Sequence, residues 1–354
     1  MRKLASLLVY LPILSLSLRA QSTPAPIPIK VVIATTFENG ADTGDKPGEF
    51  QFWVEREHLD RTLPFPGGVH PLRTNATGDV LGIVTGMTIG PSAASIMALG
   101  LDPRFDLTHA YWLLAGIAGV DPNVASVGSA AWAKWIVTDI RQEMDPREAP
   151  ADWPYGILAI GALRAAQPPD PARTWGTEPR AYPLNAALAD WAFSLTKDTP
   201  LQIPVIDTPE VKAFRATYTG FPNAQRPPFV LQGDTLSSDS YWHGVILNHW
   251  AEDWVRIHTQ GRGRFTMTAM EDSGIAEALT RLDQMHRADF RRFLDLRTAS
   301  NYSEQAPGHS AAESITAPYI GGIPALESAY RVGSPVVHEI LVHWEHYKDR
   351  LPGD

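Results

Sequence analysis

Residues 110–120 read AYWLLAGIAGV, an apolar run that passes into a series of small residues. The part from Ala110 to Leu114 is typical of a strand that is buried on both faces of a sheet. The part from Ala115 to Val120 is rich in glycine and alanine and predicts a loop at the end of that strand. In open α/β sheets, loops at strand ends are where ligands bind. This stretch therefore predicts a central strand and the position of a binding site.

The rest of the chain shows the same alternation of short buried strands and helices. Residues 29–34 and 80–84 are almost entirely apolar and rich in β-branched residues, as expected for buried strands. The second run passes through a turn over 85–90 into a predicted helix that begins after Pro91. Further strands are predicted over 124–135, 229–232, 265–268 and 289–296, and further helices over 183–196, 241–258, 273–282 and 325–347. These segments predict a single α/β domain over residues 29–350.

Both the start and the middle of the chain depart from this pattern. Residues 1–20 begin with two basic residues, continue with an apolar stretch and end in Ala20, which is typical of a secretory signal peptide. The apolar stretch is shorter than the ~20 residues that span a bilayer, so we expect cleavage and a secreted or periplasmic location. Residues 21–28 are Pro-rich and are expected to form a flexible leader. Residues 142–183, rich in Pro, Trp, Arg and Asp, are predicted to be an insertion with little regular structure.

Composition limits the classes of function that are plausible. The chain has 354 residues, of which 44% are hydrophobic and 19% charged, a normal balance for a globular protein. The formal net charge of −9, with no run of basic residues, argues against nucleic acid as a partner. No apolar run of 18 residues occurs after Leu18, so no membrane-spanning helix is expected in the mature chain.

Four short segments, in this order, make the chain resemble a known family. They are AGIAG at 115–119, MED at 270–272, RTASN at 297–301 and GSPVV at 333–337. With them, the chain resembles the purine nucleoside permease family from about Lys30 to its C-terminus. That family is similar to the nucleoside phosphorylase and nucleosidase superfamily. The resemblance implies an α/β phosphorylase-like fold in three layers, with a central mixed β-sheet flanked by helices. It also implies purine nucleosides as ligands and association into a homo-oligomer.

The resemblance further implies a role for individual positions. Glu271 matches a ribose-binding glutamate, and a carboxylate suits a 2′,3′-diol because it accepts two charge-assisted hydrogen bonds. Met270 matches a methionine that packs against the sugar. Asn301 matches the catalytic residue that protonates or hydrogen-bonds the departing base. The remaining nucleoside-binding positions belong to two turns that shape the pocket: Thr88 in the first, and Gly116, Ile117, Ala118 and Gly119 in the second.

Two departures from the superfamily concern the nucleophile. Where hexameric phosphorylases hold phosphate with an arginine and a serine, this chain has Leu114 and Ile117, which cannot bind a dianion. Phosphorolysis would then need another cation, for which Arg297 is the candidate. Hydrolysis would need no phosphate site but a carboxylate that activates water, and Glu38, after the first predicted strand, is the candidate. The sequence leaves hydrolysis and phosphorolysis open.

Most of these residues also have a purely structural interpretation. Glu271 would be favoured at the N-terminus of a helix by the helix dipole, Asn301 is a common turn residue, and Arg297 could be an ion-pair partner. The function that the sequence predicts is an exported protein that binds purine nucleosides and cleaves their N-glycosidic bond, with no cofactor and no metal. The alternative is a non-catalytic nucleoside-binding component of transport, which would depend on a separate membrane partner.

Overall fold

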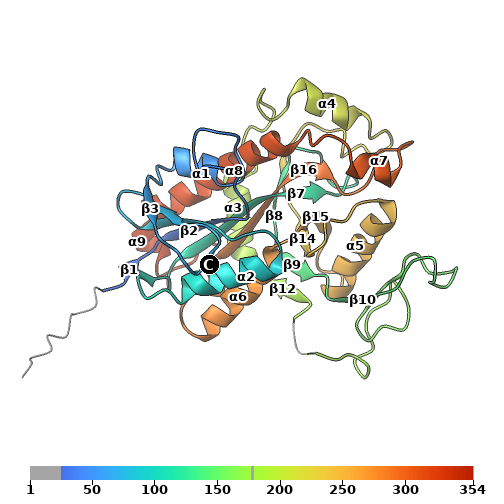
Figure 1. Ribbon diagram of the computed structural model, residues 1–354, viewed down its shortest axis with the longest axis horizontal. Coiled ribbons are helices and arrows are strands. Elements are labelled where there is room, and N and C mark those ends of the chain that lie inside the picture. The colour runs from blue at the N-terminus through green and yellow to red at the C-terminus, as the bar shows by residue number, and fades with distance from the viewer. Residues whose placement is uncertain (1–24, 177–178, 354) are drawn as a thin grey trace, which may run out of the picture.

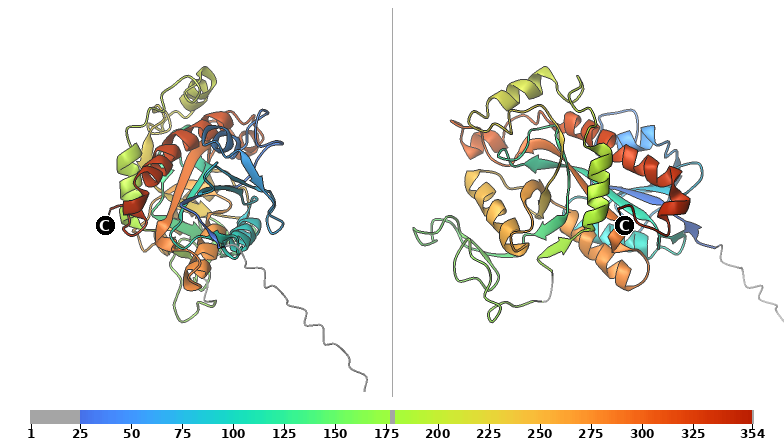
Figure 2. Two further views of the ribbon diagram at one scale, coloured as in Figure 1. Left: turned by 90° about the vertical axis from the view of Figure 1, so that its left-hand side faces the viewer. Right: turned by 180° about the vertical axis from the view of Figure 1, so that it is seen from behind.

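A computed structural model describes residues 25–176 and 179–353 of the protein. One central mixed β-sheet lies between two layers of helices, and the chain of the insertion extends from one end of the molecule (Figures 1 and 2). The signal peptide predicted over residues 1–20 lies outside the described residues.

The centre of the main sheet consists of strands that are almost entirely buried, and the shorter strands either extend this sheet or form two small separate sheets. The central strands are β2 (Val31–Thr35), β5 (Val80–Val84), β7 (Tyr111–Val120), β15 (Phe265–Ala269) and β16 (Phe293–Tyr302). The other strands are β1 (Ile27–Pro28), β3 (Arg61–Leu63), β4 (Leu72–Thr74), β6 (Phe105–Asp106), β8 (Ala130–Trp132), β9 (Trp135–Thr138), β10 (Arg141–Glu143), β11 (Ile157–Ala159), β12 (Ala181–Pro183), β13 (Val230–Gln232) and β14 (Asp234–Ser237). The main path of the sheet runs β12-β9-β14-β15-β7-β2-β5-β4-β3. Off this path, β16 pairs with β7 and with β8, and β8 pairs with β13. Two separate two-stranded sheets are formed by β1 with β6 and by β10 with β11.

The helices cover the two faces of this sheet. They are α1 (Gln51–Arg56), α2 (Ile89–Gly100), α3 (Ala186–Thr196), α4 (Pro209–Ala216), α5 (Val245–His258), α6 (Asp272–Gln284), α7 (Ala311–Ile315), α8 (Gly322–Val342) and α9 (Trp344–Tyr347). Strand β2 shows how alternation builds the layers, because successive side chains of a strand point to opposite faces. Val32 and Ala34 belong to the hydrophobic cluster formed with α2 and α6. Val31 and Ile33 belong to the cluster formed with α1, α3 and α8.

Strand β7 changes its partner along its length, and this creates an opening in the sheet. Along one edge it pairs with β16 from Trp112 to Val120. Along the other edge it pairs with β2 only as far as Leu114, and with β15 only at Gly119 and Val120. Since β2 runs parallel to β7 and β15 antiparallel, the carboxyl ends of both strands point at the uncovered residues 115–118. The residues that follow β2 and β15 therefore converge at one point of the sheet.

Several expectations from the sequence differ from the observed elements. Of the strand predicted over 124–135, only Ala130–Trp132 and the start of β9 are strand, and a 3-10 helix (Phe290–Arg292) occupies part of the strand predicted over 289–296. Residues 115–120 are not a loop but the second half of β7, and residues 297–301 lie within β16 rather than after it. Small residues pair as a strand here because their neighbours are crowded: a Cβ at Gly116 would collide with the Arg297 guanidinium. Residues 27–28, assigned to the leader, form β1 and pair with β6. Within 142–183, the described part holds only the short strands β11 and β12 and the end of β10.

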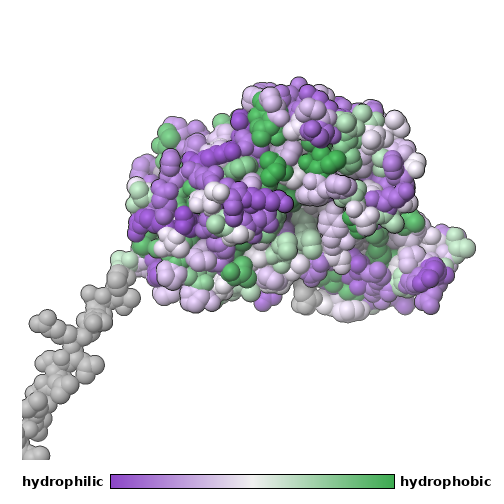
Figure 3. All heavy atoms as spheres, turned by 45° about the horizontal axis from the view of Figure 1, so that its top comes forward, coloured by the Kyte–Doolittle hydropathy of each residue, from purple (hydrophilic) through white to green (hydrophobic). Residues whose placement is uncertain are grey.

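Among the described residues, no helix is both long and apolar enough to cross a bilayer. On the face shown in Figure 3, hydrophobic residues form small separate patches among hydrophilic ones.

Candidate functional site

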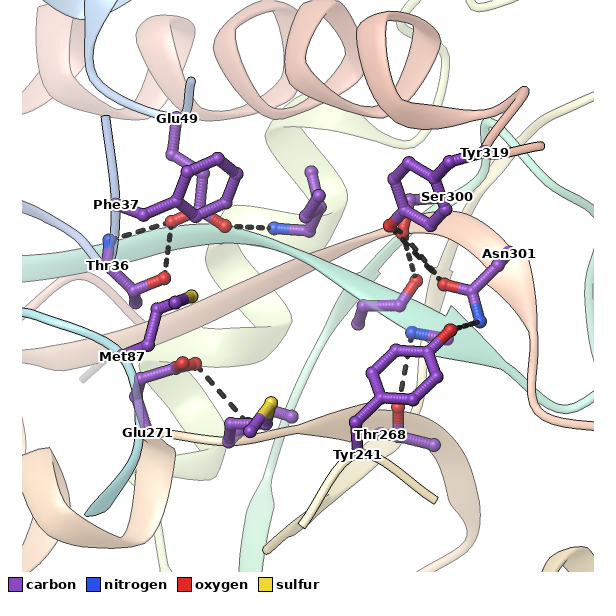
Figure 4. Close-up of a pocket in the computed structure, with 15 residues that line it drawn as sticks. Thr36, Phe37, Glu49, Met87, Tyr241, Thr268, Glu271, Ser300, Asn301 and Tyr319 are labelled. Atoms are coloured by element: carbon purple, nitrogen blue, oxygen red, sulfur yellow. Dashed lines mark hydrogen bonds between the residues drawn. The ribbon is translucent and has the colours of Figure 1, made fainter. Parts of the chain in front are cut away.

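A cavity opens where β2 and β15 diverge along β7. It encloses about 510 Å³ including its open mouth, within the range of roughly 300–1,000 Å³ that is common for small-molecule sites. Acidic residues lie at one end and an amide with two tyrosines at the other (Figure 4). The lining residues are Thr36, Phe37, Glu49, Met87, Ile117, Ala118, Gly119, Tyr241, Thr268, Ala269, Met270, Glu271, Ser300, Asn301 and Tyr319.

Glu49 holds the end of the cavity beside β2. One carboxylate oxygen accepts hydrogen bonds from the backbone N–H and the hydroxyl of Thr36, at 2.7 and 2.8 Å. The other oxygen accepts the backbone N–H of Ile117 at 2.7 Å, in the part of β7 that neither β2 nor β15 covers. The Glu49 carboxylate therefore accepts a backbone N–H of β7 that no neighbouring strand binds, and it also faces the cavity. Its pKa is raised to about 7, mainly because burial outweighs the opposing effect of Arg297, and the nearby Glu271 contributes to the rise.

Glu271 follows β15 and lies on the same side of the cavity as Glu49 (Figure 4). Its carboxylate accepts a hydrogen bond from Arg297 at 3.0 Å and from the backbone N–H of Thr88 at 3.3 Å. Thr88 has φ 76° and ψ 166°, a conformation that is strained for any residue with a side chain. Only 4% of Glu271 is exposed. The ion pair with Arg297, together with the longer backbone hydrogen bond from Thr88, therefore fixes the position of this carboxylate before any ligand arrives.

Arg297 lies behind the cavity rather than in it. It is 1% exposed, and its guanidinium donates to Glu271, to Asp272 and to the carbonyl of Ile117. A third buried carboxylate, that of Asp295, lies 3.9 Å from its Nε. One cation thus neutralises several buried carboxyl groups. Although Arg297 lowers the pKa values of these carboxyl groups, burial has the larger effect. It raises the pKa of Asp272 to about 6 and that of Asp295 well above its usual value.

Asn301 lies at the opposite end of the cavity, near the end of β16. Its Nδ2 donates to the hydroxyl of Tyr241 at 3.1 Å and to the carbonyl of Tyr302 at 3.0 Å. Its Oδ1 accepts the hydroxyl of Ser300 at 3.1 Å and that of Tyr319 at 3.4 Å. Gly119 gives this amide its space, since a Cβ there would approach Nδ2 to 3.1 Å. The side chains of Tyr241 and Tyr319 are both 53% exposed, so this end of the cavity is formed by neutral groups at the surface.

Comparison with known sequences identifies the family. The family model described as purine nucleoside permease matches residues 28–352. The chain belongs to the purine nucleoside permease family. A purine nucleoside permease of Candida albicans is 33% identical over 303 residues, which cover 83% of this chain and 72% of the relative. A probable purine nucleoside permease of Schizosaccharomyces pombe is 28% identical, covering 77% of this chain and 79% of the relative. The resemblance found in the four short segments is confirmed.

Solved structures confirm the predicted fold. A 5′-methylthioadenosine/S-adenosylhomocysteine nucleosidase from Neisseria meningitidis superimposes with a TM-score of 0.51 at 13% identity, over 88% of this chain and 99% of the nucleosidase. A futalosine hydrolase of Helicobacter pylori superimposes with a TM-score of 0.53 at 12% identity, over 88% and 98% of the two chains. At such low sequence identity, these similarities show the fold alone. This member of the permease family has the three-layer phosphorylase-like fold.

The structure brings together most of the site residues that were predicted from the sequence. Met270, Glu271 and Asn301 line the cavity, as do Ile117, Ala118 and Gly119. Three others support it from behind: Arg297 and Thr88 through Glu271, and Gly116 by leaving room for the Arg297 guanidinium.

Glu38 does not line the cavity. Its carboxylate accepts the backbone N–H groups of Gly48, Phe50 and Gln51, the last two at 2.9 and 2.6 Å. Glu38 thereby holds the turn that leads into α1. This turn carries Glu49, so Glu38 helps to position Glu49. The carboxylate that faces the cavity is therefore Glu49, and not Glu38 as predicted from the sequence.

Two cavity residues went unnoticed in the sequence. Glu49 belongs to an irregular segment, and no strand or helix pattern there indicates which carboxylate turns inward. Tyr319 lies just before α8 in a stretch of small and apolar residues, and nothing local relates it to β16. The one available signal was that Glu49 is flanked by Gly48 and Phe50, a glycine that permits close packing and a fully buried aromatic.

Proposed function

We propose that this protein binds a purine nucleoside in the cavity and hydrolyses its N-glycosidic bond, with Glu49 activating the attacking water. The observation that carries this proposal is the position of Glu49, a cavity-lining carboxylate beside Glu271 with a pKa raised to about 7. A general base is most effective when its pKa lies near the working pH.

The two ends of the cavity suit the two halves of the substrate. Glu271 is held by Arg297 and Thr88, and its remaining acceptor capacity suits the ribose hydroxyls, with Met270 beside the sugar. Asn301 suits the purine, because its Nδ2 can donate to N7 of the base while its Oδ1 can accept from an exocyclic amino group. With the sugar at Glu271 and the base at Asn301, the anomeric carbon lies between the two ends.

The chemical step needs only groups that this arrangement supplies. The oxygen of a water molecule bonds to the anomeric carbon as the bond from that carbon to N9 breaks. Glu49 takes the proton of the water, and Asn301 stabilises the departing base by hydrogen bonding at N7. The amide of Asn301 does not give up a proton, so the base takes its proton from solvent.

Water is favoured over phosphate as the nucleophile by the charges around the cavity. None of the described residues that line it is basic. Arg297, the cation considered from the sequence, is buried and its guanidinium is occupied by Glu271, Asp272 and Ile117. A phosphate dianion would therefore meet Glu49 and Glu271 without a balancing positive charge.

Non-catalytic binding in the service of transport is the second candidate function. The names of the related proteins, purine nucleoside permeases, favour it. The site geometry serves this function as well, since the contacts at Glu271 and Asn301 are binding contacts.

Product analysis distinguishes these functions. The purified protein is incubated with adenosine, inosine or guanosine, with and without phosphate, and free base and sugar are measured by chromatography. Hydrolysis predicts free base and ribose without phosphate, whereas base release only with phosphate would indicate phosphorolysis. Saturable binding without any product would leave the transport function.

A variant tests the role of Glu271 in the same assay. Glu271→Gln should lower kcat/KM by roughly 10- to 100-fold, since a hydrogen bond to a charged group contributes about 1.5–3 kcal/mol. Glu345→Gln, at an exposed glutamate of α9 that pairs with Lys348, serves as the matched control and should be unchanged. Unchanged activity of Glu271→Gln would remove this residue from the site.

A further inference from the structure

A second cavity adjoins the first behind Asn301. It encloses about 620 Å³ including its mouth, and it is more enclosed than the first. The two cavities share four lining residues, Tyr241, Ser300, Asn301 and Tyr319. The labelled shared residues lie at the amide end of the first cavity, away from Glu49 and Glu271 (Figure 4), so the second cavity adjoins this end.

The walls of the second cavity are mainly apolar. They include the ring of Phe214 and the rings of Tyr218 and Tyr302. Both of these tyrosines use their hydroxyls elsewhere, donating to the carbonyls of Glu304 and Ala224 at 2.8 and 2.7 Å. The two rings pack against each other and are each 1% exposed, so they form a closely packed apolar floor beneath the cavity.

Two isoleucines complete this cavity. Ile315 is 46% exposed and Ile320 is 39% exposed, although each contributes apolar surface to the cavity wall. Exposed aliphatic side chains lose contact with water when an apolar group is placed beside them, and this stabilises the bound state.

The cavity also contains one unused polar group, His243. Burial lowers the pKa of His243 below its usual value and so favours the neutral imidazole. Its ring donates to the backbone of Tyr302, and its Nε2 is buried without a hydrogen-bond partner among the described residues. In a neutral ring whose other nitrogen donates, this nitrogen is an acceptor. The cavity therefore suits a mostly apolar group.

A chain of hydroxyl and amide contacts separates the two cavities. Tyr241 accepts from Asn301 at 3.1 Å, and the hydroxyl of Tyr319 donates to Ser300 and to Asn301. These bonds join neutral groups, and both tyrosines are half exposed. Such bonds contribute about 0.5–1.5 kcal/mol each, so a ligand that bonds to Asn301 can replace them.

We propose that the second cavity receives an apolar substituent on the purine base, so that the preferred ligands are nucleosides modified at the exocyclic position of the base. This inference rests on the proposed function, because it places the base at Asn301. On a purine, N7 and the exocyclic group at C6 lie on the same edge. When Asn301 bonds to N7, a substituent on the exocyclic nitrogen points past Asn301 and Tyr241 toward Phe214, Tyr218 and Tyr302.

Binding of two non-cleavable probes tests this inference independently of catalysis. Carbocyclic adenosine and its N6-benzyl derivative are titrated into the purified protein by calorimetry. The benzyl derivative should bind about tenfold more tightly or better, since apolar burial exceeds the loss of the tyrosine contacts. Equal or weaker binding of the benzyl derivative, with carbocyclic adenosine bound, would overturn the inference alone. Failure of carbocyclic adenosine to bind would contradict the proposed function and, with it, this inference.

Two matched variants locate the benzyl group. Ala317→Phe places a ring in the second cavity and should abolish the preference for the benzyl derivative while leaving the affinity for carbocyclic adenosine unchanged. Ala312→Phe adds the same ring at an exposed position of α7 outside both cavities and should change neither affinity. Circular dichroism confirms that both variants are folded. A benzyl preference that persists in Ala317→Phe would show that the group binds elsewhere and would overturn the inference.

Discussion

The two ends of the cavity are built in opposite ways. At the sugar end, Glu271 is almost fully buried, ion-paired to Arg297 and held by the strained backbone of Thr88. At the base end, Asn301 is held by neutral hydrogen bonds to the hydroxyls of exposed tyrosines. Buried charged contacts are costly to rearrange, whereas exposed neutral ones are not. Under the proposed function, this contrast predicts a sugar site that is fixed in advance and a base site that adapts to its ligand.

Removing the cation at the sugar end should have the largest effect. Arg297→Met keeps much of the side-chain volume but leaves Glu271, Asp272 and Glu49 without their positive charge. The free energy of unfolding should fall by about 3–5 kcal/mol, the usual cost of an unpaired buried charge, as measured by urea denaturation at pH 8. Arg281→Met, at an exposed α6 ion pair with Glu277, is the control. A loss as small as that of the control would contradict the description of this end as charge-stabilised.

The variant Glu49→Gln tests whether Glu49, at the same end of the cavity, activates the attacking water. The amide cannot accept the proton of the attacking water, so kcat for base release should fall by about 10²–10⁴-fold, the usual contribution of a general base. The affinity for carbocyclic adenosine should change much less, because Glu271 and Asn301 supply the binding contacts. Rates and affinities are measured by chromatography and calorimetry. Retention of kcat would assign water activation to another group.

The pH dependence of hydrolysis should report the pKa of Glu49. Burial raises this pKa to about 7, so the group is protonated and inactive below that value. The rate constant kcat/KM should rise about tenfold per pH unit up to pH 7 and then level off. The residual activity of Glu49→Gln should lack this rise. A wild-type profile without a limb near pH 7 would exclude Glu49 as the base.

A change at the base end should have the smallest effect, and it should strengthen ligand binding. Tyr241→Phe removes the hydroxyl that occupies Asn301 in the free protein. A ligand then no longer replaces this contact, and carbocyclic adenosine should bind about 2- to 10-fold more tightly, in line with the 0.5–1.5 kcal/mol of one neutral hydrogen bond. Calorimetry measures the affinity. Weaker binding would show that the tyrosine hydroxyl contacts the ligand and does not compete with it.

The local sequence pattern predicted the longer helices α2, α3, α5, α6 and α8, but it missed the shorter helices α1, α4 and α7 and misjudged how far β7 and β16 extend. Continuous apolar runs located β2, β5 and the start of β7. Gly116 and Gly119 were interpreted as loop residues, because their role depends on Arg297 and Asn301, which approach from β16. Sequence spacing holds no information on such crowding between distant segments.

The site was predictable only where it follows a regular strand. Glu271 and Met270 come directly after β15, so their position followed from the strand and from the family resemblance. Glu49 reaches the cavity through an irregular turn that Glu38 holds together, and only the folded chain shows which of these two carboxylates faces inward.

A crystal structure of the Glu49→Gln variant with adenosine would test the central claim most directly. The account predicts intact adenosine in the cavity, with the ribose hydroxyls on Glu271, N7 of the base on Asn301 and the Tyr241 hydroxyl displaced from the Asn301 amide. A nucleoside bound outside this cavity, or one with its base at Glu271 and its sugar at Asn301, would contradict it.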